Sequence, residues 1–67
     1  MNALMQSPNQ TEIKQARKQA GLTQSQAAEL IHASAGGWRK WETGAREMHA
    51  AFWELFLIKI KTPGEKI

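Results

Sequence analysis

The most constraining part of this chain is the stretch from Thr23 to Gly44, TQSQAAELIHASAGGWRKWETG, in which two short helices are marked at both ends. Thr23 can accept a hydrogen bond from the free backbone N–H groups of a first helical turn, and Gln26 can reach back to it in a capping box. Ser34 offers the same cap to a second helix, and Gly44 suits the left-handed residue that ends one. The sequence therefore predicts helices from Thr23 to Ile31 and from Ser34 to Gly44.

Only His32 and Ala33 separate these two helices, so the second must turn sharply away from the first. Histidine tolerates a positive φ better than most residues other than glycine, so His32 can serve in the turn with some strain. Two helices that a turn of three or four residues sets at a steep angle form a helix-turn-helix.

Helical periodicity assigns the two faces of the second helix. The inward face groups Ser34, Trp38 and Trp41. The outward face is cationic and flat, and it comprises Gly36, Arg39, Lys40 and Thr43. We expect this outward face to lie in the major groove of DNA.

The residues GLTQSQAAELI, then Ser34, then WRKWETG resemble the phage-repressor class of helix-turn-helix proteins, the Cro/cI or XRE type. That class usually carries G-L-T-Q, an apolar helix, a turn, a capping serine and W-E-x-G. The resemblance extends back into Ile13 to Gly21 and forward to about Ile60, and its motif is more specific for the fold than for the operator. The small size and the ending HAAFWELFLIKI are also similar to autorepressors encoded beside anti-CRISPR genes in phages.

Scarce proline and abundant helix formers predict an all-α protein. The resemblance implies a compact bundle of about five short helices, a lambda-repressor-like DNA-binding domain that dimerises through its last helix. Outside the central pair, we expect a first helix from Thr11 to Ala20, which Gly21 ends, and a short turn or helix from Glu47 to Ala51. An apolar last helix should run from Phe52 to Ile60.

Sixty-seven residues allow one small domain with a modest core. We expect this domain to span residues 11–61, between a flexible arm in residues 1–10 and a tail in residues 62–67. The formal net charge of +3 favours a polyanionic partner such as nucleic acid, although many small proteins are mildly basic. The chain has no cysteine, which fits a reducing cytoplasm and leaves no thiolate for a metal site.

Base contacts are expected from the second predicted helix. Arg39 and Lys40 can each donate to guanine O6 and N7, and arginine does so in the more specific bidentate way. The alternative is an ordinary solvated cationic face. The resemblance implies that the positions of Ala35, Gly36 and Lys40 commonly read bases. We expect phosphate contacts from Gln24, assisted by the positive end of its helix, and from Thr43 and Arg46. The candidate DNA-binding residues are therefore Gln24, Ser34, Ala35, Gly36, Gly37, Arg39, Lys40, Thr43 and Arg46.

The pair Gly36-Gly37 is unusual, because each glycine inside a helix costs about 1 kcal/mol relative to alanine. One interpretation is a bare surface that allows close approach, with Ala35 touching a thymine methyl group. A second is a helix that DNA orders on binding. A third is a pair of substitutions that weaken DNA binding. The sequence leaves all three open.

Arg17 falls on the apolar face of the first predicted helix, where an unpaired charge would be costly. In the repressor family, an arginine at the matching place pairs with the glutamate of W-E-x-G, which is Glu42 here. We therefore expect an Arg17–Glu42 ion pair, and the alternative is an Arg17 whose head reaches solvent.

The last predicted helix is apolar over a wider arc than a small core can use, which usually marks an interface. Phe52, Leu55 and Phe56 define its core face. We expect a homodimer contact from the remaining apolar residues, Trp53, Leu57, Ile58 and Ile60. The alternative is a last helix that is fully buried in a monomer.

The leading hypothesis is a homodimeric repressor that binds an inverted-repeat operator, and the alternative is an antitoxin or adaptor whose last helix grips a protein. An enzyme is not expected, because no nucleophile–base set or phosphate-cradling loop appears. His32 and His49 alone make a weak metal signal. We expect no cofactor, no small-molecule ligand and no membrane partner.

Overall fold

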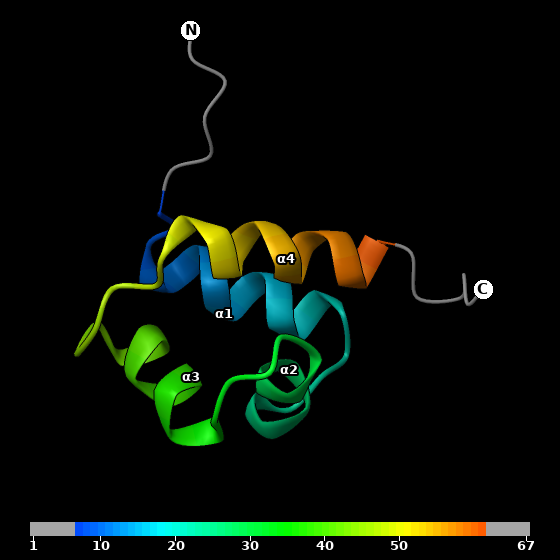
Figure 1. The fold of residues 1–67 in the computed structure, drawn as a ribbon. Helices are drawn as coiled ribbons and strands as arrows, with labels where there is room; N and C mark the ends of the chain where they lie inside the picture. Colours follow the sequence, from blue (N-terminus) through cyan, green and yellow to red (C-terminus); the bar gives the residue numbers. More distant parts are fainter. Residues whose placement is uncertain (1–6, 62–67) are drawn as a thin grey trace, which may run out of the picture.

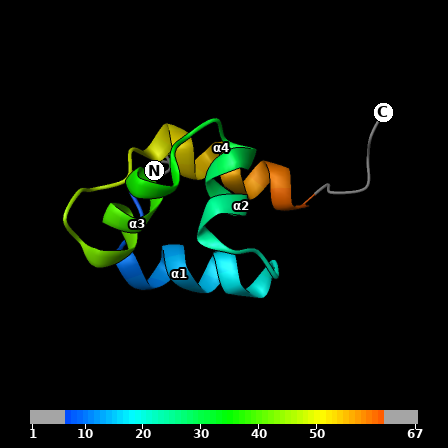
Figure 2. The ribbon, with the colours of Figure 1, turned by 90° about the horizontal axis from the view of Figure 1, so that it is seen from below.

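Residues 7–61 are described in the computed structural model of the chain, and they form four α-helices with no strand (Figure 1). The helices are α1 (Gln10–Gln19), α2 (Gln24–Leu30), α3 (Ala35–Thr43) and α4 (Ala50–Lys61). α1 and α4 lie in one layer, and α2 and α3 lie in a second layer beneath it (Figures 1 and 2). The expected all-α class is confirmed.

The helix-turn-helix is delimited by the caps that the sequence predicts. The Thr23 hydroxyl accepts from the Gln26 N–H at 3.0 Å, and the Gln26 side chain accepts from the Thr23 N–H at 2.9 Å. The Ser34 hydroxyl accepts from the Gly37 N–H at 3.0 Å, and Gly44 follows α3 with a φ of 86°.

The turn between α2 and α3 contains His32 in a left-handed conformation, with a φ of 60°. Its N–H donates to the Glu29 carbonyl at 3.2 Å, and the Ala33 N–H donates to the Ala28 carbonyl at 2.9 Å. These two bonds form a Schellman motif, which normally carries glycine at this position. The expectation that His32 takes a positive φ is confirmed.

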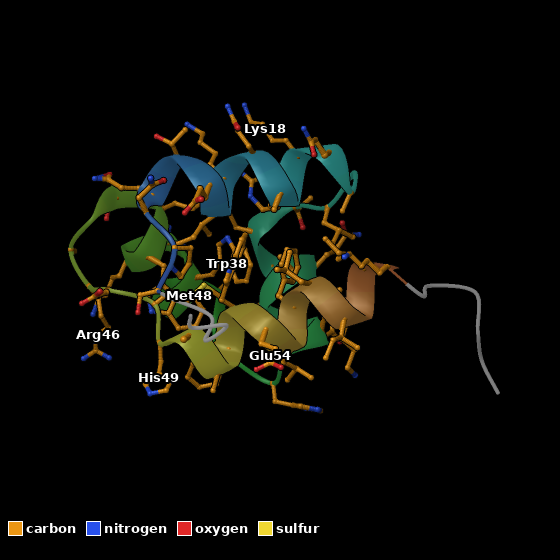
Figure 3. The ribbon with its side chains drawn as sticks, turned by 90° about the horizontal axis from the view of Figure 1, so that it is seen from above. Lys18, Trp38, Arg46, Met48, His49 and Glu54 are labelled. Carbon is orange, nitrogen blue, oxygen red and sulfur yellow. The ribbon has the colours of Figure 1, made fainter. Side chains whose placement is uncertain are left out.

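The core lies between the two layers and is centred on Trp38, whose side chain is fully buried. Its ring packs edge-on against Trp41 and Phe56, with centroids 5.6 and 4.9 Å apart. Met48 reaches this core from the loop after α3 (Figure 3). The other buried hydrophobic residues are Ile13, Ala27, Ala28 and Ile31.

The expectation of about five helices is not confirmed, since the described part of the chain has four. The segment that leads into α4 forms no helix of its own. Met48 is fully buried, and His49 caps α4 instead of belonging to an earlier helix. His49 Nδ1 accepts from the Ala51 N–H at 2.9 Å, and its carbonyl accepts from the Phe52 N–H at 3.0 Å. The last helix therefore begins at Ala50.

The folded unit begins earlier than residue 11. Pro8 is buried, and Asn9 caps α1 in a capping box with Glu12. The rest of the expected arm and the whole expected tail, residues 1–6 and 62–67, lie outside the described residues.

Two expected inward positions differ in the structure. Ser34 is exposed, because its hydroxyl must stay at the open end of α3 to accept from Gly37. Phe52 was expected on the core face and is 40% exposed, although its ring lies 5.5 Å from that of Trp41.

Candidate nucleic-acid interface

α3 separates apolar and cationic side chains onto opposite faces. Trp38 and Trp41 are buried, with 0% and 7% of their surface exposed. Arg39 and Lys40, which lie between the two tryptophans in sequence, are exposed. Each tryptophan is large enough to fix the rotation of the helix, so the two cationic residues must point outward.

The first turn of α3 presents almost no side chain to its surroundings. An added Cβ at Gly36 would meet nothing within 4 Å, so the fold itself does not require glycine there. An added Cβ at Gly37 would lie 3.2 Å from the Ser34 hydroxyl, which is tighter than ordinary contact. Ser34, Ala35 and Gly36 therefore leave the backbone at the start of α3 open to close approach.

The loop after α3 adds a further cation. The Arg46 N–H donates to the Lys40 carbonyl at 3.2 Å, which holds the loop against the end of the helix. The Arg46 side chain is exposed and points away from the bundle (Figure 3). The Thr43 hydroxyl donates to the same Lys40 carbonyl at 3.2 Å, so Thr43 has a local role in ending α3.

Glu42 is the centre of a polar cluster that joins α1, α2 and α3. Arg17 donates to both carboxylate oxygens, from Nε to Oε2 at 2.6 Å and from Nη2 to Oε1 at 3.1 Å. The Trp38 indole donates to Oε2 at 2.6 Å, and the Gln24 amide donates to Oε1 at 3.1 Å. The ion pair that the sequence predicts is therefore present, and Arg17 does not carry its head into solvent.

This cluster keeps the Glu42 carboxylate charged although only 4% of its side chain is exposed. Burial raises the pKa of Glu42, but the hydrogen bonds from three residues, Arg17, Trp38 and Gln24, and the Arg17 charge together outweigh it. The pKa of Glu42 therefore lies below its usual value. The hydrogen bond to Glu42 raises the pKa of Arg17 against the cost of burial. The negative charge on α3 is thus neutralised inside the protein and does not oppose a polyanion outside.

Sequence reasoning missed the inward role of Gln24. It was expected to meet a phosphate, and its amide nitrogen is bonded to Glu42 instead. An amide nitrogen carries two hydrogens, so one donor of the half-buried Gln24 is still free of that bond. The sequence shows that Gln24 stands at the start of α2, but this position alone does not indicate that Glu42 of α3 lies beside it.

The four candidate dimer residues differ in how exposed they are. Trp53 and Ile60 are half-buried and pack against the core, and the Trp53 ring stacks on Phe56 with centroids 6.4 Å apart. Leu57 is half-buried, and Ile58 is 54% exposed. Of the four residues expected at a dimer contact, Ile58 is therefore the one that is exposed, and Phe52 is a second exposed large apolar residue of α4.

Within the described residues, no group of three or more His, Cys, Asp or Glu side chains could hold a metal ion. Between residues 7 and 61, each helix is too short or too polar to cross a membrane.

Comparison with known proteins agrees with this geometry. A family model described as a helix-turn-helix domain matches residues 11–66. The chain is also 41% identical over 49 residues to the type II methyltransferase M.MspI of Moraxella sp. That match covers 73% of this chain but 12% of the methyltransferase, so the chain corresponds to a small part of that relative.

Proposed function

The chain belongs to the helix-turn-helix domain family, and we propose on that basis that it is a sequence-specific DNA-binding repressor. The observation that carries this proposal is the division of α3, with two buried tryptophans on one face and exposed Arg39 and Lys40 on the other. A short helix of this kind fits the major groove of DNA.

Arg39 and Lys40 are the proposed base-reading residues, through guanine O6 and N7. The bare turn at Ala35, Gly36 and Gly37 would let the helix approach the base edges closely. Nothing within 4 Å of a Gly36 Cβ explains the glycine, and this favours an external reason for it.

Phosphate contacts are proposed for Arg46, whose guanidinium points away from the bundle, and for Ser34 and Thr43 at the two ends of α3. Gln24 would contribute its second amide hydrogen at the start of α2, where the helix end favours an anion. Such contacts fix the orientation of a protein on the duplex but carry little sequence information.

We propose a homodimer on an inverted-repeat operator, because one α3 reads too few base pairs for useful specificity. We further propose that the operator lies before the gene of the protein itself, as in the anti-CRISPR-associated phage autorepressors that the chain resembles. The similarity to M.MspI covers 12% of that methyltransferase, so we propose a binding module and no enzymatic activity here.

The second candidate is an adaptor or antitoxin that grips a protein through α4. The exposed Phe52 and Ile58 favour it, since large apolar side chains on a surface often mark an interface.

Footprinting on the DNA upstream of the gene tests these two functions. A repressor protects a short palindromic site, and its affinity falls steeply as salt is raised. Weak protection without sequence preference, together with tight binding to a protein, would favour the adaptor.

A further inference from the structure

The outward side of the first turn of α3 has a position without a side chain. Gly36 lies nearly opposite the buried Trp38, because two residues advance an α-helix by about 200°. Three and four residues later, the exposed Arg39 and Lys40 follow on the same side of the helix as Gly36. A Cβ added at Gly36 would meet nothing within 4 Å. The outward face of α3 therefore has an open space the size of a methyl group beside two long cationic side chains, and we call this space the Gly36 gap.

The residues around the Gly36 gap offer it no polar side chain. Ala35 contributes a methyl group, and Gly37 has no side chain. The Ser34 hydroxyl oxygen accepts from the Gly37 N–H at 3.0 Å, at the cap of the helix. The side chains of residues 35–37 therefore cannot form a hydrogen bond with the edge of a base, and the gap suits an apolar group.

We propose that the Gly36 gap receives the C5 methyl group of a pyrimidine base in the major groove. The inference rests on the proposed DNA-binding function and names the group that the start of α3 recognises. This methyl group, carried by thymine, is the apolar group that unmodified base pairs present in the major groove. Cytosine presents the same group only where it has been methylated at C5.

The direction in which the gap opens favours a methyl group over a phosphate group. The free N–H groups in the first turn of a helix point along its axis, beyond its end, and an anion binds there. The Gly36 gap instead opens sideways, on the face that carries Arg39 and Lys40. A contact on this face also gives an external reason for a glycine that weakens α3 and that no internal contact requires.

Removing the methyl group from the DNA tests the proposal. In the operator that the footprint identifies, each thymine in turn is replaced by deoxyuridine, which lacks only that methyl group. At one position in each half-site, we expect the dissociation constant to rise about fourfold, which corresponds to the roughly 0.8 kcal/mol gained by burying one such carbon group. In an operator variant with cytosine at that position, methylation at C5 should lower the dissociation constant by a similar factor.

Moving the methyl group from the DNA to the protein tests its place. Gly36→Ala fills the gap, so its methyl group collides with that of thymine but has room beside deoxyuridine. We expect Gly36→Ala to bind the deoxyuridine operator more tightly than the thymine operator, which reverses the preference of the unmodified protein. Gly37→Ala is the matched control, because it adds the same group to the same turn, 3.2 Å from the Ser34 hydroxyl, and should keep the preference for thymine. Circular dichroism should show both variants folded.

Each contrary outcome has a separate meaning. A sequence-specific footprint that no deoxyuridine replacement weakens would overturn the methyl contact and leave the repressor function intact. A Gly36→Ala protein that keeps the preference for thymine, whatever its overall affinity, would overturn the Gly36 gap as the place of that contact. An unmodified protein without any sequence preference would overturn the proposed function, and the inference with it.

Discussion

At the scale of single residues, Glu42 links the interior of the protein to its binding face. Removing a carboxylate from water is costly, and the cost is offset here by four donated hydrogen bonds, two of them from Arg17. The ring N–H of Trp38 takes part, so the residue that orients α3 also stabilises the Glu42 carboxylate. Stability and the direction of α3 thus depend on the same cluster.

Replacing Glu42 with alanine should lower the free energy of unfolding by about 3–5 kcal/mol, because the change leaves the largely buried Arg17 head, whose side chain is 13% exposed, without its carboxylate partner. Thermal unfolding followed by circular dichroism measures the effect. Glu47→Ala is the control, since Glu47 is exposed in the loop, and it should stay within about 0.5 kcal/mol. Equal melting temperatures for Glu42→Ala and the unmodified protein would show that the cluster does not stabilise the fold.

The stabilisation from Glu42 should disappear in acid. The pKa of Glu42 is lower in the folded protein than in the unfolded chain, so its contribution is fully present above the ordinary glutamate pKa of about 4.3 and is lost as the pH falls through the folded-state pKa. Denaturant titrations from pH 7 to pH 2 should show the unmodified protein and Glu42→Gln converging below about pH 4. A constant difference across that range would contradict the assignment.

Local signals explain which residues could be predicted from the sequence. The caps at Thr23 and Ser34 and the left-handed Gly44 depend on residues within a few positions of each other. The Arg17–Glu42 pair is distant in sequence, and the family pattern supplied it. The bond from Gln24 to Glu42 was not predicted, because it depends on how α2 meets α3 in space.

At the scale of elements, Gly36 lowers the stability of α3, and no contact within the fold requires a glycine there. Gly36→Ala should stabilise the protein by about 0.5–1 kcal/mol, since an added methyl group has open space around it. If close approach to DNA is the reason for the glycine, the same change should weaken operator binding. Thermal unfolding and a DNA titration on one preparation measure both effects.

Gly37→Ala is the matched control for this experiment. Its methyl group would press on the Ser34 hydroxyl that caps α3, so it should stabilise less than Gly36→Ala or even destabilise. A Gly36→Ala protein that is more stable and binds DNA as well as before would rule out close approach at this position.

The limits of α2 and α3 were predictable because strong caps flank a clear helical period. α4 was harder, for two reasons. His49 is not a usual cap, yet its ring nitrogen accepts from Ala51 and sets the start of the helix. The apolar arc of α4 also does not show by itself which of its residues pack against the core. The contact of Phe56 with Trp38 in the structure shows it.

At the scale of the whole molecule, part of the exposed positive charge lies on the layer that carries α3. The formal net charge is +3. Arg39, Lys40 and Arg46 are exposed on α3 and the loop that follows it, while Glu42 is neutralised inside. A modest net charge can therefore act locally on a polyanion, because the acidic group of α3 itself is already paired.

Two substitutions separate base reading from phosphate contact. Lys40→Ala should cost about 1–3 kcal/mol on the operator and relax the preference at one base pair, because Lys40 lies on the outward face of α3. Arg46→Ala should weaken binding to all sequences by a similar factor and reduce the slope of log affinity against log salt by about 1.

Lys59→Ala is the control, because α4 lies in the other layer of the fold, and it should leave both readouts unchanged. Titrations of the operator and of its single-base variants at several salt concentrations give affinity and slope together. A Lys40→Ala protein that loses equal affinity on every sequence would reassign Lys40 to the phosphate backbone and leave Arg39 as the base-reading residue.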